Sequence, residues 1–240
     1  MAENMWDDAP PPQDLELKLT GVAAAPTDSP DTFRVLLNTT RGEIRGLLHP
    51  VEGGSGAVIC VGGAMGGMDG PADSLYGRLP AALEPEGVTV LRIEYREPNE
   101  FQECVLDVLA ACSFLKGIGA VDLVLVGHSF GGAVVIKAAE LASNVVSVAS
   151  LSPQLFGTRQ VEELHKPLLL IHGMVDSVLN HEASEDIYRR ANEPKQIVLY
   201  AAAGHSLIQV KDEILELLTR WIPDRLAGIT MQGGRTEVEL

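Results

Sequence analysis

The stretch Val121-Asp-Leu-Val-Leu-Val126 runs directly into Gly127-His-Ser-Phe-Gly-Gly132, and this junction decides the fold. Its first half is an apolar run typical of a buried β-strand, and a helix is expected from residue 130. A serine between a strand and a helix sits on a sharp turn, and only small neighbours such as Gly127 and Gly131 let the two backbones pass closely. Because such a turn exposes the hydroxyl, Ser129 is a candidate nucleophile.

A serine hydroxyl is a weak nucleophile at neutral pH, so this interpretation requires a histidine base and a carboxylate elsewhere in the chain. The apolar run 167–171 predicts another buried strand, and Asp176 lies just past its carboxyl end. A third run, 196–200, leads into a loop that holds His205. Parallel strands would bring the ends of these segments to one edge of a sheet.

These residues resemble the α/β-hydrolase family, and more narrowly its small lidless serine esterases of the dienelactone-hydrolase kind. The resemblance covers about residues 43–222 and is carried by the segments 127–132 (Gly-His-Ser-Phe-Gly-Gly), 172–176 (His-Gly-Met-Val-Asp) and 204–205 (Gly-His). The chain order serine, aspartate, histidine is also the order of that family. The resemblance implies a catalytic triad in which Ser129 is the nucleophile, Asp176 orients the base and His205 is the base.

The resemblance further implies an oxyanion hole made of backbone amides. One amide would be that of Phe130, the residue after the nucleophile. The other would lie in Gly62-Gly-Ala-Met-Gly-Gly67, which follows the strand candidate 57–61 and replaces the His-Gly-Gly-Gly sequence of many esterases. We expect Ala64 to donate it, with Gly63 as the next choice.

Apolar runs alternate with helical segments along the chain, which predicts an α/β fold with a mostly parallel central sheet and helices on both faces. The expected strands are 57–61, 88–93, 121–126, 145–151, 167–171 and 196–200, and the expected helices lie near 72–84, 100–116, 130–142, 181–192 and 206–222. Amphipathic strands are expected before this core, from the alternation of Leu15, Leu17 and Leu19 and from a hairpin formed by 32–37 and 43–48.

The domain organisation that we expect has three parts: a flexible acidic N-terminus at 1–13, one α/β-hydrolase domain at 14–224, and a tail at 225–240. The tail shows little periodicity, which leaves open a mobile segment or a subunit contact in a homo-oligomer. The short segment between Ser152 and Pro167 leaves no room for a cap domain.

The composition sets limits on partners and location. A formal net charge of -15 opposes binding to nucleic acid or to an anionic membrane. The three cysteines form no Cys-x-x-Cys pair, and the acidic N-terminus lacks the pattern of an export signal. We therefore expect a cytoplasmic protein with no cofactor and no metal.

An open site suits small acyl esters, lactones or thioesters as substrates. The residues that we expect near the pocket are Met65, Met68, Phe130, Gln154, Leu155, Phe156 and Val178, and core packing is the alternative role for each. Tyr95 and Arg96 follow a strand and could meet a polar or anionic substrate group, or Arg96 could pair with Glu94, Glu97 or Glu100 and hold the loop.

Several alternatives stay open. Ser129 could simply cap a helix. His128 and His172 are rivals to His205, and His172, Asp176 and His205 could instead hold a metal. The glycine-rich loop lacks the spacing of a nucleotide site. At the level of function, the alternatives are a peptidase or amidase on the same fold and a non-catalytic binding module.

Overall fold

The computed structural model describes residues 16–239, so the N-terminus predicted at 1–13 and the residue Leu15 lie outside the described residues. Within that range ten strands form one sheet, in the order β1-β2-β3-β5-β4-β6-β7-β8-β9-β10. The strands are β1 (Leu19–Pro26), β2 (Phe33–Thr39), β3 (Gly42–His49), β4 (Gly56–Val61), β5 (Val88–Glu94), β6 (Asp122–His128), β7 (Val145–Leu151), β8 (Leu168–Gly173), β9 (Lys195–Tyr200) and β10 (Gly234–Val238).

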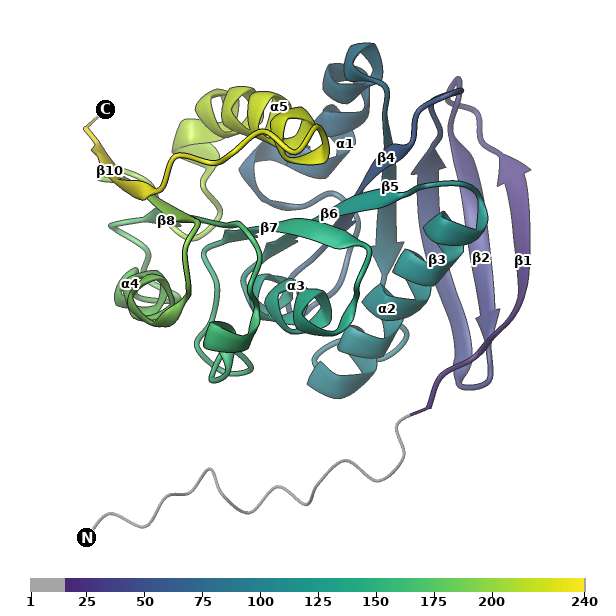
Figure 1. Cartoon of the computed structure of the whole chain (residues 1–240), viewed down its shortest axis with the longest axis horizontal. Coiled ribbons are helices and arrows are strands. Elements are labelled where there is room, and N and C mark those ends of the chain that lie inside the picture. The colour runs from purple at the N-terminus through teal and green to yellow at the C-terminus, as the bar shows by residue number, and fades with distance from the viewer. Residues whose placement is uncertain (1–15, 240) are drawn as a thin grey trace, which may run out of the picture.

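The helices are α1 (Pro71–Leu83), α2 (Phe101–Gly117), α3 (Phe130–Leu141), α4 (Glu182–Arg190) and α5 (Lys211–Leu226), with short 3-10 turns η1 (Glu84–Glu86), η2 (Val161–Glu163) and η3 (Ile208–Val210). Strands β1, β2, β3 and β5 pair antiparallel in turn, and each neighbouring pair from β5 to β10 is parallel. Helices α1 and α5 cover one face of the sheet, and α2, α3 and α4 cover the other (Figure 1).

Two apolar clusters fill the spaces between the sheet and its helices. In β4, Val58 and Cys60 pack toward α1 and α5, whereas Ile59 and Val61 pack toward α2 and α3. A strand covered on both faces needs apolar residues at every position, which explains the continuous apolar runs in the sequence. The predicted α/β architecture with a mostly parallel sheet is thereby confirmed.

The first strands alternate as amphipathic strands do, although the pattern begins later than the sequence suggests. In β2 and β3 buried residues alternate with more exposed ones. The edge strand β1 begins only at Leu19 and is exposed at most positions. Between β7 and β8 the described chain forms only the short turn η2, so no cap covers the sheet edge there.

Two segments near the C-terminus differ from the expectation. The last helix was expected at 206–222, but α5 begins at Lys211, because Leu207 has a φ of 56° that a right-handed helix cannot contain. The tail contains β10, which pairs parallel with β9. Arg235 of β10 also forms an ion pair of 2.6 Å with Glu185 of α4.

Among residues 16–239, none of the helices combines the length and apolar character that crossing a membrane requires.

Helix α3 contacts the sheet backbone through glycines. A Cβ atom at Gly131 would overlap the carbonyl oxygen of Gly62, at the end of β4. A Cβ atom at Gly127 would overlap the carbonyl of Gly131 in the same way. The turn between β6 and α3 therefore depends on the absence of side chains at these positions.

We predict that Gly131→Ala lowers the free energy of unfolding by about 1–3 kcal/mol, because α3 must move away from β4 to admit the methyl group. Gly117→Ala is the matched control, since a Cβ at Gly117 meets no atom within 4 Å. Urea denaturation of both variants measures the difference. Equal stability of the two variants would contradict the close contact.

Candidate active site

Ser129 occupies the turn between β6 and α3 in a backbone conformation that non-glycine residues rarely adopt. Its φ is 58° and its ψ is -120°. Its backbone is fixed on both sides, because its amide donates to Leu151 O at 2.8 Å and its carbonyl accepts from the amide of Gly132 at 3.0 Å. Strain of this kind persists only where the surrounding structure enforces it, and here it presents the Ser129 hydroxyl at the sheet edge.

His205 lies in the loop after β9 and joins the serine to an aspartate. Its Nε2 lies 3.0 Å from Ser129 Oγ, and its Nδ1 lies 2.7 Å from Asp176 Oδ2. Because the carboxylate can only accept at neutral pH, Nδ1 carries the proton and Nε2 accepts from the Ser129 hydroxyl. The three side chains singled out in the sequence thus form one hydrogen-bonded line.

The His205 loop is held by His128, the residue before Ser129. His128 Nε2 donates to the backbone carbonyl of His205 at 2.9 Å, and the two rings lie 4.8 Å apart. Burial lowers the pKa of His128 to about 4, so this ring is neutral near pH 7. His128 therefore contacts the backbone of His205 rather than the Ser129 hydroxyl.

Asp176 follows β8, and four donors surround its carboxylate. Oδ1 accepts from the amides of Val178 and Leu179, both at 2.8 Å. Oδ2 accepts from His205 and also from His172 Nε2, at 3.1 Å. Burial alone would raise the pKa of Asp176, but the hydrogen bonds from Leu179, His205 and Val178 hold it below its usual value.

His172 is fully buried beneath Asp176, away from Ser129. Its Nε2 also faces Leu179 O at 3.0 Å, so Nε2 carries the proton, and Nδ1 accepts from Ser184 Oγ at 2.7 Å. Burial lowers the pKa of His172, although Leu179 O and Asp176 act in the opposite direction. In the described part of the chain, no group of three or more His, Cys, Asp or Glu side chains is arranged to hold a metal ion.

The glycine-rich loop after β4 lies against the serine. A Cβ atom placed on Gly63 would be 3.6 Å from Ser129 Cβ. The loop turns back on itself through the hydrogen bond from Gly66 N to Gly63 O, at 2.9 Å. Outside the helices and strands, no backbone hydrogen bond runs from the Ala64 amide to another described residue, and Phe130 is the first residue of α3, where an amide has no partner within the helix.

The predicted pocket residues separate into two groups. Met65, Leu155, Phe156 and Val178 are exposed, and Gln154 lies beside Ser129, whose carbonyl accepts from the Gln154 amide at 3.3 Å. The other two predicted residues, Phe130 and Met68, lie elsewhere.

The Phe130 side chain is 3% exposed and packs edge-on against Phe101, with ring centroids 5.9 Å apart, so it belongs to the core. Met68 lines a separate hollow over the outer face of β1, β2 and β3. The reason is the same in both cases: a sequence position near the site does not fix which way a side chain points.

Tyr95 and Arg96 are buried rather than open to substrate. The Arg96 guanidinium pairs with Asp107 and, at 2.8 Å, with Glu103, both in α2. The Tyr95 hydroxyl points to Gly62 O at 3.4 Å. Arg96 therefore fixes the loop after β5 to α2, through two acidic partners that were not among those considered from the sequence.

Large exposed apolar residues lie in the loops at the same edge of the sheet as Ser129, and we call them the apolar rim. We define this rim as Met65, Leu155, Phe156, Val175, Val178 and Ile208, which are the large hydrophobic residues exposed in the loops after β4, β7, β8 and β9. Two of the rim residues, Val175 and Ile208, were not in the sequence-predicted set. Their position in the sequence could have indicated them, because each lies within three residues of Asp176 or His205.

A groove of about 690 Å³ adjoins the rim at Leu155 and Val178. Glu182, Glu185 and Asp186 are among its lining residues, with Arg189 as the one cation among those residues. Arg189 is itself paired with Asp186. The surroundings of the site are therefore apolar close to the serine and acidic further out.

The parallel sheet, the turn at Ser129 and the loops at the carboxyl ends of the strands define an α/β hydrolase. The chain belongs to the dienelactone hydrolase family, whose model matches residues 75–219, more than half of its length. No functionally curated protein matches the chain in sequence.

Several solved structures share the fold. A dienelactone hydrolase from Anabaena variabilis is 16% identical, with a TM-score of 0.69 over 83% of this chain and 98% of that chain. Est1E from Butyrivibrio proteoclasticus is 16% identical, with a TM-score of 0.66 over 77% of this chain and 95% of that chain. An alpha-beta serine hydrolase homologue from Coxiella burnetii is 21% identical, with a TM-score of 0.68 over 83% and 100%.

We predict that His172→Leu lowers kcat about 10- to 100-fold with little change in KM, because a hydrogen bond to a charged group contributes about 1.5–3 kcal/mol. The matched control is His165→Leu, since His165 is exposed and lies 3.8 Å from its partner Glu163. Steady-state kinetics and thermal unfolding are measured on both. An unchanged kcat in a folded His172→Leu variant would show that His172 does not position Asp176.

Proposed function

We propose that this protein is a serine hydrolase that cleaves small neutral esters through an acyl-enzyme intermediate. The observation that carries the proposal is the line of two hydrogen bonds, 3.0 Å from Ser129 Oγ to His205 Nε2 and 2.7 Å from His205 Nδ1 to Asp176 Oδ2. Both distances lie in the range that general-base activation of a hydroxyl requires.

In the first half of the reaction, Ser129 Oγ attacks the ester carbonyl carbon while His205 Nε2 takes the hydroxyl proton. The carbonyl double bond becomes a tetrahedral oxyanion, which the amides of Phe130 and Ala64 would stabilise. His205 then donates the proton to the leaving alcohol as the bond to it breaks. In the second half, water repeats these steps on the acyl-enzyme and releases the acid.

Asp176 keeps the His205 ring in the required tautomer and stabilises the imidazolium that forms. Its lowered pKa supports this role, because the carboxylate stays ionised near neutral pH. The four donors around the carboxylate also prevent it from rotating away. The aspartate therefore acts through position and charge and does not take up the proton.

The substrate class follows from the surroundings of the serine. The apolar rim favours an acyl or aryl group that has water-avoiding surface. The carboxylates of the adjoining groove oppose a negatively charged substrate. A structure of Est1E carries ferulic acid, which supports an aromatic group as one choice for a protein of this fold.

We predict that Ser129→Ala abolishes covalent labelling by a fluorophosphonate, because the probe needs the activated hydroxyl. Ser113→Ala is the matched control, since Ser113 is an exposed serine on α2 that bonds only Leu109 O, at 3.0 Å. Mass spectrometry of the intact protein and peptide mapping detect the covalent adduct and the residue that carries it. Labelling that survives Ser129→Ala would show that Ser129 is not the nucleophile. Faster turnover of p-nitroanilides than of matched p-nitrophenyl esters would favour an amidase over an esterase.

We predict that Phe156→Ala raises KM for p-nitrophenyl esters up to about 10-fold, because part of an aromatic contact of about 1.5–3 kcal/mol is lost. Ile118→Ala is the control, since Ile118 is 53% exposed, close to the 56% of Phe156, but follows α2 at the opposite edge of the sheet. An unchanged KM for Phe156→Ala would remove this residue from the substrate site.

A further inference from the structure

Among residues 16–239, Arg92 of β5 is a buried cation that has no buried counter-ion. Its side chain is 9% exposed, and its Nε has no hydrogen-bond partner among the described residues. The nearest carboxylate oxygen, on Asp69, is 3.7 Å from Nη1, and the Asp69 side chain is 79% exposed to water. Solvent weakens such a pair strongly, so the charge of Arg92 is largely unbalanced.

Arg96, in the loop after β5, differs from Arg92 in having carboxylate partners. Arg96 is equally buried, but its guanidinium meets two buried or nearly buried carboxylates, on Asp107 and Glu103. A buried charge is costly unless a partner of opposite sign lies beside it. The protein provides such a partner for Arg96 and leaves Arg92 without one.

The immediate neighbour of Arg92 cannot supply a negative charge. Arg92 Nη2 lies 3.1 Å from His49 Nε2, and because a guanidinium only donates, Nε2 accepts. His49 Nδ1 then donates to Thr32 Oγ1 at 3.1 Å, and Thr32 Oγ1 donates to Pro30 O at 3.1 Å. Burial and the charge of Arg92 lower the pKa of His49 to about 4, so the ring is neutral at physiological pH.

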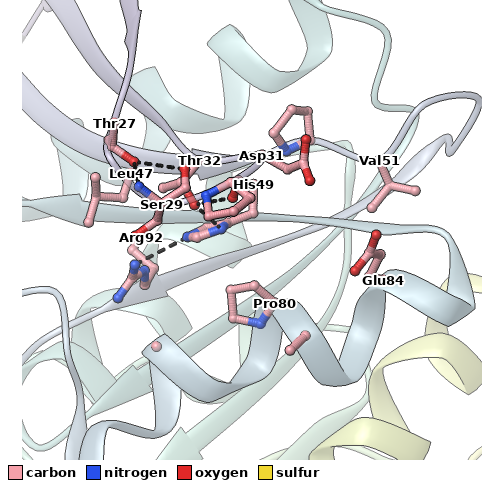
Figure 2. A pocket seen from close by; sticks show the side chains of 14 residues that line it. Thr27, Ser29, Asp31, Thr32, Leu47, His49, Val51, Pro80, Glu84 and Arg92 are labelled. Atoms are coloured by element: carbon pink, nitrogen blue, oxygen red, sulfur yellow. Dashed lines mark hydrogen bonds between the residues drawn. The ribbon is translucent and has the colours of Figure 1, made fainter.

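A cavity of about 540 Å³ opens beside this group, between α1 and the segment from β1 to β3 (Figure 2). The face of α1 that lines it carries Gly77, Pro80 and Ala81, which are too small to fill the space. A Cβ on Gly77 would come within 3.4 Å of Arg92 Nη1. Gly77 therefore lies against the guanidinium without a side chain to cover it further, and Nη1 also donates to the carbonyl of Met68 at 3.4 Å.

The two ends of the cavity differ in charge. Arg92 and His49 lie at one end with Thr27, whereas Glu84 lies at the other, with Asp31 nearer to that side (Figure 2). Pro80 of α1 lies between the two ends, below the cavity in Figure 2, whereas Leu47 lies near the Arg92 end and Val51 near Glu84. A second negative charge on a ligand would be repelled at the Glu84 end.

We propose that this cavity is a second binding site, remote from Ser129, for a small zwitterion. Its oxyanion, a carboxylate or a phosphate, pairs with the Arg92 guanidinium. Its ammonium group lies toward Glu84 and Asp31, and a short carbon chain crosses the space beside Pro80. Arg92 supplies the charge-assisted donors, and the acidic end selects for the cation.

The test is isothermal titration of the full-length protein with defined probes. The two-ended probes carry both an ammonium group and an oxyanion, and they are 4-aminobutyrate, 6-aminohexanoate and phosphoethanolamine. The one-ended probes carry only one of these groups, and they are acetate, inorganic phosphate and butylamine. We expect at least one two-ended probe to bind about 10-fold more tightly than any one-ended probe, which corresponds to one additional paired charge. A preference among the two-ended probes identifies carboxylate or phosphate as the oxyanion.

Matched variants locate the binding. Arg92→Gln should weaken the best probe at least about 10-fold, whereas Arg45→Gln, an equal charge change at an exposed position of β3, should leave it unchanged. Glu84→Gln should remove the advantage of the two-ended probe. Ala81→Trp, on the exposed surface of α1, should block binding with Arg92 intact, so the test survives if Arg92→Gln fails to fold.

No saturable heat with any probe would overturn the site. Binding that Ala81→Trp and a folded Arg92→Gln leave unchanged would overturn its location. One-ended anions that bind as tightly as the two-ended probes would overturn the assignment of a zwitterion.

Discussion

The close approach of α3 to the end of β4 is the constraint on which the rest of the site depends. Gly131 lies against the carbonyl of Gly62, and Gly127 lies against Gly131, so β6 can turn into α3 within a single residue. That residue is Ser129, whose φ of 58° no relaxed strand or helix would produce. The same contact brings the glycine-rich loop beside the serine at Gly63, so the proposed nucleophile and the proposed oxyanion donors lie close together.

The loops that carry Asp176 and His205 are held by hydrogen bonds of their own. Two backbone amides and two imidazoles surround the Asp176 carboxylate, and His128 binds the carbonyl of His205. These contacts fix the Nδ1 side of the His205 ring and the backbone that carries it before a substrate arrives. Preorganisation of this kind lowers the cost of reaching the transition state, because no dipole has to reorient during the reaction.

Much of this arrangement could be predicted from the sequence, because buried parallel strands leave continuous apolar runs and their ends meet at one edge. For that reason Ser129, Asp176 and His205 could be singled out before any geometry was known. Strand β10 could not, since its pairing with β9 uses backbone groups and leaves little pattern in Gly-Arg-Thr-Glu-Val. The direction of the Phe130 side chain and the unbalanced charge of Arg92 depend on three-dimensional neighbours, which a single sequence does not specify.

The proposed mechanism requires that Ser129 carries the acyl group during turnover. The most direct measurement is rapid acid quenching of the wild-type protein during hydrolysis of a p-nitrophenyl ester, followed by mass spectrometry of its peptides. We expect one acyl group per chain, on the peptide that contains Ser129. It should form at least as fast as steady-state turnover. Turnover without an acylated peptide, or acylation at another residue, would contradict it.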